Sequence, residues 1–409
     1  MEKKEKKPKI RFKGFTEAWE QRKVTELGKI YIGLVTSMTK HYTNKGTLLI
    51  RNSDIKSNRF EFDEDPIYLE ESFAKENSSR MHQIGDVVTV HTGDVGTSAV
   101  ITEKEDKSIG FATIVTRPNN RIITSNYLCA FLNTEKHKRF AVQISTGDGR
   151  TNYNLGDYFE LEVPYPEIKE QEKIAKIIDN VDNLITLHQR KYDKLVNIKK
   201  SLLEKMFPKN GSIIPKIRFK GFTEAWEQRK VGDFGEVITG NTPSTQNDEY
   251  YSEDGILWVT PTDINSNTIN NTAKKLSDEG IKVARILPKE SILVTCIASI
   301  GKNTMLENTG SCNQQINALI PNTKKYYPYF LLTESTLWSN KMLRSASAGT
   351  MQIVNKTEFS EIDTYSPELS EQNKIGEFFR SIDNLITLHQ RKLDKLKNVK
   401  KSLLEKMFV

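Results

Sequence analysis

The sequence has few cysteines and no long apolar run, and both absences exclude classes of protein. Its 409 residues include three cysteines, Cys129, Cys296 and Cys312, with no CxxC or CxxH pair. This spacing predicts neither a disulfide framework nor a zinc site, so a reducing cytoplasm is the expected compartment. No apolar stretch approaches the roughly 20 residues that a membrane-spanning helix needs. The charged start, MEKKEKKPKI, is not the pattern of a secretory signal.

Motifs of the common catalytic and nucleotide-binding sites are also missing. HExxH, GxSxG and GxGxxG do not occur, and no two prolines are adjacent, which excludes the Asp/Asn-Pro-Pro-aromatic motif of amino-methyltransferases. SIGKNT (299–304) is similar to a phosphate-binding loop, but Cys296 replaces the upstream glycine and no serine or threonine directly follows Lys302. We therefore expect a non-catalytic chain. A free-standing nuclease or methyltransferase is the alternative, which an assay of the purified chain alone would test.

The composition is that of a globular protein with a mild excess of positive charge. Hydrophobic residues make up 37% and charged residues 28% of the chain, which is ordinary for a folded domain. The length allows two or three domains, each with its own core. The net charge of +7 is a mild indication of a polyanionic partner.

The chain consists of two copies of one plan. PKIRFKGFTEAWEQRKV at 8–24 returns letter for letter at 215–231, and 182–207 returns at 383–408 with three differences in 26 positions. The middle segments correspond only at short stretches such as IRNSDIKSN and VTPTDINSN. Both halves have had equal time to diverge since the duplication. We therefore expect that a constraint keeps the sequence of the repeated blocks unchanged and that this constraint does not act on the middle segments. Gene conversion of the shared blocks would give the same pattern.

Each closing segment has the pattern of a long amphipathic helix. Apolar residues recur at steps of four and three, which is a heptad seam. Each helix would hold about 35 residues and extend roughly 50 Å. The linker PKNGSII is short, so we predict antiparallel pairing, because parallel pairing would require the chain to return over most of that length. The predicted seam residues are Ile174, Ile178, Val181, Ile185, His188, Leu195 and Leu202, and in the second copy Ile375, Phe379, Ile382, Ile386, His389, Leu396 and Leu403.

Two polar residues interrupt each seam at equivalent places. They are His188 and Lys199 in the first copy and His389 and Lys400 in the second. Nothing nearby in the sequence supplies further metal ligands, so we predict no metal site; a polar seam residue commonly sets register or pairing. The repeated KKSLLEKMF is basic on its outer face, which is either solvated surface or a docking surface for a partner subunit.

The two middle segments predict similar domains that mix helices and strands. Short β-branched runs alternate with turn residues, and each middle holds one helical stretch, about 125–144 and 327–345. The fold class is therefore α+β, with two similar α/β domains separated by a two-helix antiparallel coiled coil, and the two halves are related by a pseudo-twofold.

The loops of the middle segments contain side chains suited to DNA. Arginine and lysine pair with guanine or neutralise phosphates, and asparagine or glutamine pairs bidentately with adenine. Any one of these residues alone also fits a solvated loop or a turn cap, so the prediction depends on their clustering. The predicted DNA-binding residues are Arg51, Asn52, Ser53, His91, Thr92, Arg150, Asn152 and Tyr153 in the first middle, and Thr260, Thr262, Lys302, Asn313, Gln314, Gln315, Thr350, Met351 and Gln352 in the second.

Several of these stretches together resemble a known family. The opening IRFKGFTEAWEQRKV, the helix entrances PEIKEQEKI and PELSEQNKI, and GNTPST, WVTPTDI, IASIGK and NQQINAL in the second middle resemble the specificity subunit of type I restriction–modification enzymes. The resemblance covers essentially the whole chain. The first middle departs most from the family pattern, with HTGDVGT where the second has CIASIGK.

The resemblance implies a DNA-binding function in defence against foreign DNA. Each middle would be a target recognition domain, and the pair would read a bipartite sequence in double-stranded DNA. The two helices would fix the spacing and carry two modification (methyltransferase) subunits, which restriction (ATP-dependent translocase/endonuclease) subunits then join. The family's subunit has no catalytic residues and binds no cofactor; S-adenosylmethionine, ATP and Mg2+ belong to the partners.

These expectations define a domain plan and a competing interpretation. We predict target recognition domain 1 over 1–165, the first long helix over 166–207, a linker over 208–214, target recognition domain 2 over 215–366 and the second long helix over 367–409. The alternative is an adaptor whose coiled coil joins two protein-binding domains. Sequence-specific, salt-sensitive binding to duplex DNA would distinguish the two.

Overall fold

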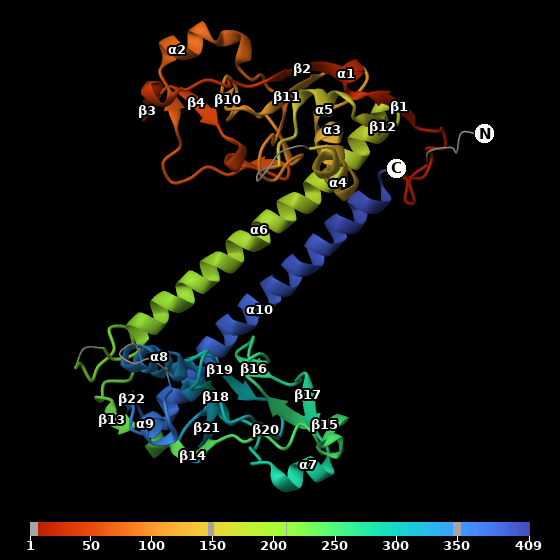
Figure 1. Cartoon of the computed structure of the whole chain (residues 1–409). Coiled ribbons are helices and arrows are strands. Elements are labelled where there is room, and N and C mark those ends of the chain that lie inside the picture. Colours follow the sequence, from red (N-terminus) through yellow and green to blue (C-terminus); the bar gives the residue numbers. More distant parts are fainter. Residues whose placement is uncertain (1–6, 146–150, 210, 347–352) are drawn as a thin grey trace. The chain divides into compact units, whose positions relative to one another are not determined.

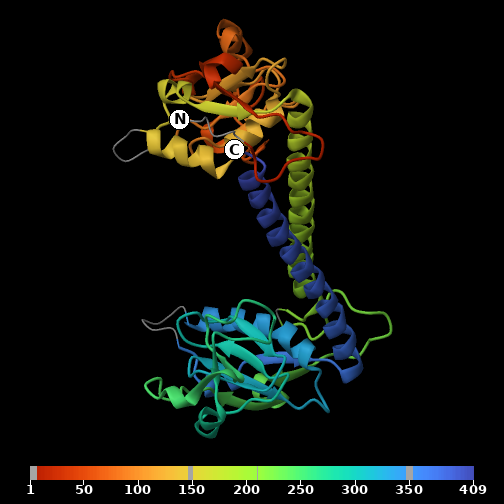
Figure 2. The same cartoon turned by 90° about the vertical axis from the view of Figure 1, so that its right-hand side faces the viewer.

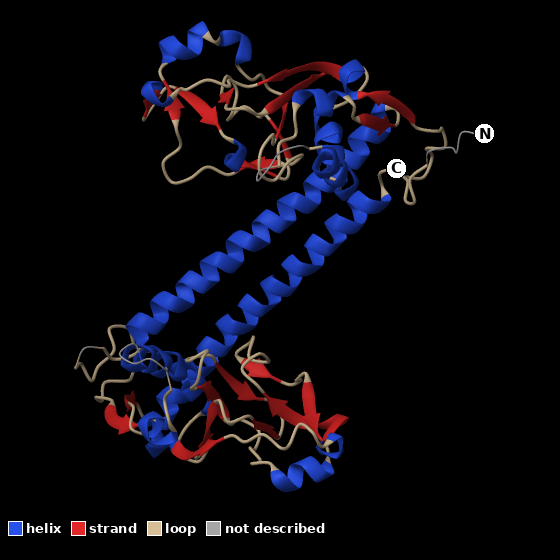
Figure 3. Ribbon diagram, in the orientation of Figure 1, coloured by secondary structure: helices blue, strands red, loops and turns tan. Residues whose placement is uncertain are grey.

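The chain folds into two compact units that are built alike. The structure, a computed structural model, describes residues 7–145, 151–209, 211–346 and 353–409. Residues 1–189 with 391–409 form the first unit, and residues 190–390 form the second. Each unit therefore holds one α+β domain, the start of the long helix that leaves this domain, and the end of the other long helix (Figures 1 and 3). The predicted domain plan instead gave each long helix a segment of its own.

The first unit contains three sheets and a hairpin. Its strands are β1 (Glu20–Lys23), β2 (Gly28–Ile32), β3 (Tyr42–Thr43), β4 (Thr47–Ile50), β5 (Ile55–Lys56), β6 (Arg59–Phe60), β7 (Tyr68–Leu69), β8 (Val87–Thr89), β9 (Ser98–Val100), β10 (Ile109–Gly110), β11 (Ile114–Pro118) and β12 (Glu162–Tyr165). The central antiparallel sheet has the order β2-β11-β8-β9, and a second sheet has the order β10-β4-β7-β3. β1 pairs with β12, and β5 with β6. Val88 and Val115, opposite each other in the central sheet, are fully buried.

Short helices cover these sheets. They are α1 (Val24–Leu27), α2 (Glu71–Glu76), α3 (Ser125–Leu132), α4 (Glu135–Ile144) and α5 (Leu155–Phe159), with 3-10 turns η1 (Thr39–His41), η2 (Asn52–Asp54) and η3 (Ser78–Arg80). The stretch 125–144, predicted as one helix, is two. Asn133 Nδ2 donates to the carbonyls of Cys129 and Ser98 at 2.9 Å, and Thr134 Oγ1 accepts from His137 N at 3.2 Å. The break follows because Asn133 ends α3 and Thr134 is the N-cap of α4.

The second unit repeats this plan. Its strands are β13 (Glu227–Lys230), β14 (Gly235–Thr239), β15 (Tyr251–Val259), β16 (Thr268–Ile269), β17 (Lys274–Leu276), β18 (Ile292–Thr295), β19 (Asn303–Leu306), β20 (Gly310–Cys312), β21 (Ile316–Pro321) and β22 (Asp363–Ser366). The order β14-β21-β18-β19-β16 matches the central sheet of the first unit, with one strand more. The sheet β17-β15-β20 and the pair β13-β22 match the others. Its short helices are η4 (Val231–Phe234), η5 (Asp248–Tyr250), α7 (Asp278–Val283), α8 (Pro328–Ala346) and α9 (Lys356–Ser360).

The two long helices are α6 (Ile168–Met206) and α10 (Leu369–Lys406). Within each unit, the start of one runs beside the end of the other in the opposite direction (Figures 1 and 2). In the first unit Lys400 Nζ lies 2.6 Å from Asp182 Oδ1, and in the second Lys199 Nζ lies 2.6 Å from Asp383 Oδ1. The two polar seam lysines of the sequence thus each meet a carboxylate of the opposite helix.

Burial differs along the predicted seam. The seam residues at the start of each helix are at most 8% exposed: Ile174, Ile178, Val181, Ile375, Phe379 and Ile382. The others are half-buried: Ile185, His188, Leu195, Leu202, Ile386, His389, Leu396 and Leu403. Each helix is therefore packed tightly at its start, where it leaves its own domain, and Leu393 of α10, 1% exposed, is a further buried position later in the helix.

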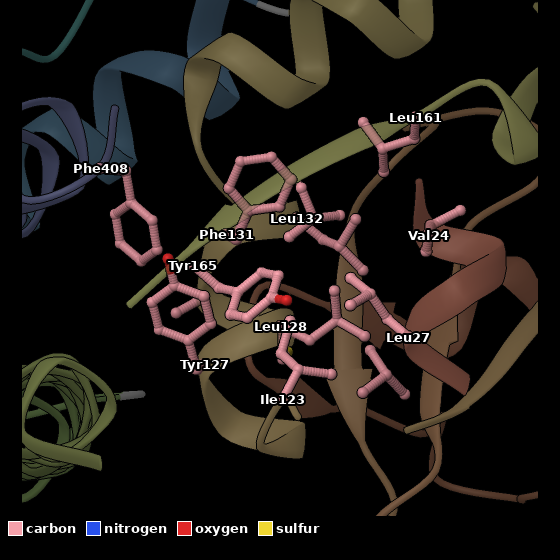
Figure 4. Close-up of a cluster of buried hydrophobic side chains, with 14 of the residues drawn as sticks. Val24, Leu27, Ile123, Tyr127, Leu128, Phe131, Leu132, Leu161, Tyr165 and Phe408 are labelled. Atoms are coloured by element: carbon pink, nitrogen blue, oxygen red, sulfur yellow. The ribbon is translucent and has the colours of Figure 1, made fainter. Parts of the chain in front are cut away.

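The repeated blocks contact each other inside each unit. In the first unit Phe408, which follows α10, lies 5.3 Å from Tyr127 between ring centroids (Figure 4). Its ring centroid lies 6.5 Å from that of Trp19. In the second unit Phe207 lies 5.7 Å from Trp226 and 5.6 Å from Phe330. Each domain core is therefore completed by the end of the helix that leaves the other domain.

Buried ion pairs attach each opening block to the helix that follows its own domain. Arg11 donates to both carboxylate oxygens of Glu170 at 2.8 and 2.9 Å, and Arg218 to those of Glu371 at 2.7 and 2.8 Å. Both glutamate side chains are fully buried. These contacts account for the identity of the buried positions in the repeated blocks.

Candidate nucleic-acid interface

In the first unit, the described candidate residues gather in one cluster of loops. Asn52 Oδ1 accepts from His91 N at 2.8 Å, and Thr92 Oγ1 donates to Asn152 Oδ1 at 3.0 Å. Tyr153 N donates to His91 O at 2.9 Å. Segments 51–54, 91–92 and 152–153, which are far apart in the sequence, thus form one cluster of loops.

A carboxylate-capped turn forms the first of these segments. The backbone N of Arg51 donates to Asp54 Oδ2 at 2.8 Å, and the Arg51 guanidinium bonds to Asp54 and to Asp63. These hydrogen bonds, that of Asp54 first, raise the pKa of Arg51. The guanidinium therefore stays charged and held in place at the edge of the cluster, beside the exposed Ser53.

The second unit builds the same turn from its own residues. Thr260 N donates to Asp263 Oδ2 at 2.8 Å, and Thr260 Oγ1 donates to the same oxygen at 2.6 Å. Asp54 and Asp263 were not among the predicted site residues, although the aspartate shared by IRNSDI and VTPTDI was the signal for them. They fix the backbone of the turn and also accept hydrogen bonds from the side chains of Arg51, Ser53 and Thr260.

The candidate loops of the second unit also come together. Lys302 Nζ donates to Pro261 O at 3.2 Å, which joins the loop after β18 to the turn after β15. Asn313 N donates to Val259 O at 3.0 Å, and Thr242 Oγ1 donates to Gln314. Thr242, in GNTPST, is a residue that sequence reasoning did not select. The cluster therefore presents Thr260, Thr262, Lys302, Gln314 and Gln315 from three loops.

Two candidate residues are buried beneath these loops. Tyr153 is fully buried, with its ring centroid 5.8 Å from that of His137 and 5.6 Å from that of Tyr158. Asn313 is 8% exposed and bonds to Gln315 through both its amide N and its carbonyl O. We assign these two side chains to supporting the loops. Four other candidates, Arg150, Thr350, Met351 and Gln352, lie outside the described residues.

The candidate loops offer hydrogen-bond donors and positive charge, and the described ranges show no metal-binding cluster. No group of three or more His, Cys, Asp or Glu residues within those ranges could hold a metal ion. Burial lowers the pKa of His91, so its imidazole is neutral at pH 7. Burial raises the pKa of the Cys129, Cys296 and Cys312 thiols, which makes them poor nucleophiles and poor ligands. No helix of the described ranges has both the length and the apolar character to cross a bilayer.

Comparison with known proteins identifies the class to which these paired domains belong. The family model for the type I restriction modification DNA specificity domain matches the chain twice, at residues 16–197 and 223–398. The chain therefore belongs to this family and is a type I restriction–modification specificity subunit with two DNA specificity domains.

Individual relatives agree with this assignment. The HindI specificity subunit of Haemophilus influenzae is 33% identical over 146 residues, which span 35% of this chain and 32% of the relative. The putative MjaX specificity subunit of Methanocaldococcus jannaschii is 23% identical over 336 residues, 78% of this chain and 77% of the relative. The crystal structure of the type I S subunit from M. genitalium shares the fold, with a TM-score of 0.66 at 15% identity over 98% of this chain and 99% of that one.

Proposed function

We propose that this chain reads a bipartite sequence in double-stranded DNA, with one half-site for each domain, and holds two modification subunits. The proposal rests on a comparison of the two copies: they have the same residues in the repeated blocks and different residues in the loops. The repeated blocks complete the cores and make the helix contacts of both units, whereas the loops that gather Asn52, His91 and Thr92 in one unit gather Thr260, Lys302 and Gln314 in the other. Two domains that share one scaffold but have different loops are suited to reading two different half-sites.

The chemistry of the loops supports reading by hydrogen bonds. Lys302 brings positive charge that can neutralise a phosphate or pair with guanine, and the exposed Gln314 has an amide that can pair with adenine. The Arg51 guanidinium and the Asn52 amide bond to groups of their own domain and hold the loops of the first cluster in place. Each wrong base pair would cost on the order of 1–3 kcal/mol, roughly additively over separated positions. A two-part site therefore multiplies the discrimination of its two halves.

The chain itself is proposed to be non-catalytic. Methylation with S-adenosylmethionine would take place in the modification subunits, and cleavage with ATP and Mg2+ in restriction subunits that join through them. The long helices would set the distance between the two half-sites, on the order of one turn of B-DNA.

The test is selection of bound sequences from a random duplex library by the chain with its modification subunits. We expect two short specified half-sites separated by an unspecified spacer. Lys302→Ala is expected to alter only the half-site of the second domain, as the sequence predicts for Gln352→Ala, and His91→Ala only that of the first. Equal weakening of both half-sites would contradict the loop assignment. A flat response across the library would favour the protein-binding adaptor.

A further inference from the structure

A motif of five residues recurs in the two middle segments, where most other residues differ. It is DIKSN at 54–58 in the first unit and DINSN at 263–267 in the second. Its aspartate caps the turn before it, at 51–54 or 260–263, by accepting from the backbone N of the turn's first residue. We call these two turns the recognition turns. The cap accounts for the shared aspartate but not for the shared asparagine, which lies beyond the turn.

In the first unit the motif forms a hairpin that ends at this asparagine. β5 and β6 pair as far as Lys56 and Arg59, so Ser57 and Asn58 form the two-residue tip. Asn58 has a φ of 63°, which is in the left-handed region that asparagine adopts more readily than most residues. Its backbone N donates to the carbonyl of Ser98 in β9 at 3.0 Å. The tip is therefore fixed against the central sheet of the domain.

The side chain of Asn58 joins this tip to both long helices. Its Nδ2 donates to Asp182 Oδ2 of α6 at 2.6 Å. The other carboxylate oxygen of Asp182 lies 2.6 Å from Lys400 Nζ of α10, and the same Nζ donates to Ser57 Oγ at 3.3 Å. Asn58 Oδ1 accepts from Asn133 Nδ2 at 2.9 Å. The tip of the hairpin is therefore bonded to both members of the ion pair that joins the two helices in this unit.

The second unit makes the corresponding connection through one further side chain. Tyr329 OH donates to Asp383 Oδ2 at 3.0 Å, and Asp383 pairs with Lys199 at 2.6 Å. Burial raises the pKa of Tyr329, and a hydrogen bond with the Asn267 side chain lowers it. Asn267, which stands where the first unit has Asn58, is therefore connected to the helix ion pair through the Tyr329 hydroxyl.

The connection between turn and helices is short and has little freedom to move. Three residues separate Asp54 from Asn58, and Ile55 between them is 2% exposed. Glu61 N donates to Asp54 O at 2.9 Å, which joins the end of the hairpin to the turn. Hydrogen bonds to a charged group are roughly twice as strong as neutral ones. A shift of the helix ion pair should therefore move the turn, since the residues between them are fixed by these contacts.

We infer that Asn58 and Asn267 are positioning residues for base recognition, because each fixes the recognition turn of its domain to the ion pair between the long helices. The inference rests on the proposed function, which assigns base reading to the loops that contain these turns, and adds the contacts that orient the turns. Both polar atoms of the Asn58 side chain bond to groups of its own unit, so its role does not require contact with DNA. Since Lys400 belongs to α10, the helix that follows the second domain should influence the half-site that the first domain reads.

The test compares the affinity of the chain with its modification subunits for the selected duplex and for duplexes with one changed base pair, at one salt concentration. The ratio of the two dissociation constants is the discrimination of the half-site that carries the change. Asn58→Gly keeps the left-handed backbone and removes the side chain. We expect it to lower the discrimination of the first half-site about tenfold, the order of one base contact, and to leave the second unchanged.

The matched control is Lys107→Gly. Lys107 is an exposed residue of the same domain with a φ of 62°, so glycine makes the same backbone replacement there at a distance from the network. The control should keep the discrimination of both half-sites.

Two changes outside the hairpins test the connection itself. Lys400→Met removes the cation on α10 and should lower the discrimination of the first half-site. The double variant with Asn58→Gly should lose little more, because both changes act through Asp182. Lys400→Arg, which keeps the cation, should retain most of the discrimination. Tyr329→Phe removes the connecting hydroxyl of the second unit and should affect the second half-site alone.

The outcomes separate this inference from the proposed function and from a purely structural role. A domain that only unfolds more easily binds every duplex less, so its discrimination stays constant. Constant discrimination in Asn58→Gly, or equal losses at both half-sites in Lys400→Met, would overturn the inference and leave the proposed function intact. A wild-type complex that prefers no duplex would overturn both. Should circular dichroism show that Asn58→Gly unfolds, Tyr329→Phe decides the matter, and unchanged discrimination of the second half-site would overturn the inference.

Discussion

At the scale of single residues, the buried carboxyl of Glu334 stands out in the core of the second unit. Its Oε1 accepts from Thr364 Oγ1, and Trp338 Nε1 donates to the same hydroxyl at 3.1 Å. Its Oε2 is buried without a hydrogen-bond partner in the described residues. Burial raises the pKa of Glu334 to about 8, against the hydrogen bonds of Thr364 and Tyr365, which lower it. The side chain is therefore mostly protonated at pH 7.

This shift makes the stability of the second unit depend on pH. A glutamate in the unfolded chain titrates near pH 4.3, about four units lower, so between these two values the folded state holds the extra proton. Stability contributed by this proton is present below the unfolded pKa and is lost as pH rises through the folded pKa. Glu334→Gln, which cannot ionise, should lack this slope. We expect the wild type to lose stability relative to Glu334→Gln by on the order of 1 kcal/mol per pH unit between pH 6 and 8.

The measurement is urea unfolding of wild type and variant at pH 6, 7, 8 and 9. Glu279→Gln, at an exposed position of α7, is the control and should keep a constant offset from the wild type. A constant offset for Glu334→Gln as well would show that the carboxyl carries no extra proton in the folded state.

Contacts between individual side chains were the feature that the sequence predicted least well. The shared aspartate of IRNSDI and VTPTDI was visible, but only the folded turn shows that its carboxylate caps the backbone N of Arg51 and of Thr260. Tyr153 was selected as a loop residue, yet its ring completes the core. Whether a loop side chain is exposed or buried depends on its contacts with segments that are distant in the sequence. The local sequence pattern of the loop contains no information on those contacts.

At the scale of elements, one ion pair joins the two long helices in each unit. In the second unit Asp383 is 8% exposed at its side chain, accepts from Tyr329 OH at 3.0 Å and pairs with Lys199. Lys199→Met would leave this carboxylate buried without its cation. We expect a loss of about 2–3 kcal/mol in the local stability of this helix pair. Hydrogen exchange of residues 375–390 would measure it.

The matched control is Lys200→Met, one position further along α6 and exposed, which should change little. Exchanging the charges, with Lys199→Asp and Asp383→Lys together, should restore part of the protection that Lys199→Met removes. Equal protection in Lys199→Met and Lys200→Met would show that the pair does not hold the helices together.

Elements with a strong period were predictable, and those set by single side chains were not. The seam spacing predicted both long helices, because an apolar stripe over many turns has no stable alternative to burial. The break between α3 and α4 was missed, because it depends on the amide of Asn133 reaching the Ser98 carbonyl in a neighbouring strand. α8 in the second unit runs unbroken over Pro328–Ala346, as predicted.

At the scale of the whole molecule, the core of each domain includes residues from the other half of the chain. Phe408, which follows α10, packs in the core of the first unit, and Phe207, which follows α6, packs in that of the second. The sequence shows that these segments are repeated but not where they lie, since KKSLLEKMF fits an exposed helix end equally well. Exchange of helix ends explains why both ends had to stay alike: each meets the same Trp-containing block, around Trp19 or Trp226.

The proposed spacing role of the helices predicts the effect of lengthening them together. Seven residues added after Gln189 and after Gln390 would keep the heptad seam in register and lengthen each helix by about 10 Å, close to three base pairs of B-DNA. The ends of both helices and their cores are unchanged, so we expect both half-sites to be retained and the spacer between them to grow by about three base pairs. Mapping methylated adenines in cells that express the lengthened chain with its partners would measure the spacer. The same insertion in α6 alone puts the two seams out of step, so it should abolish methylation. An unchanged spacer after the double insertion would mean that something other than the helices sets the distance between half-sites.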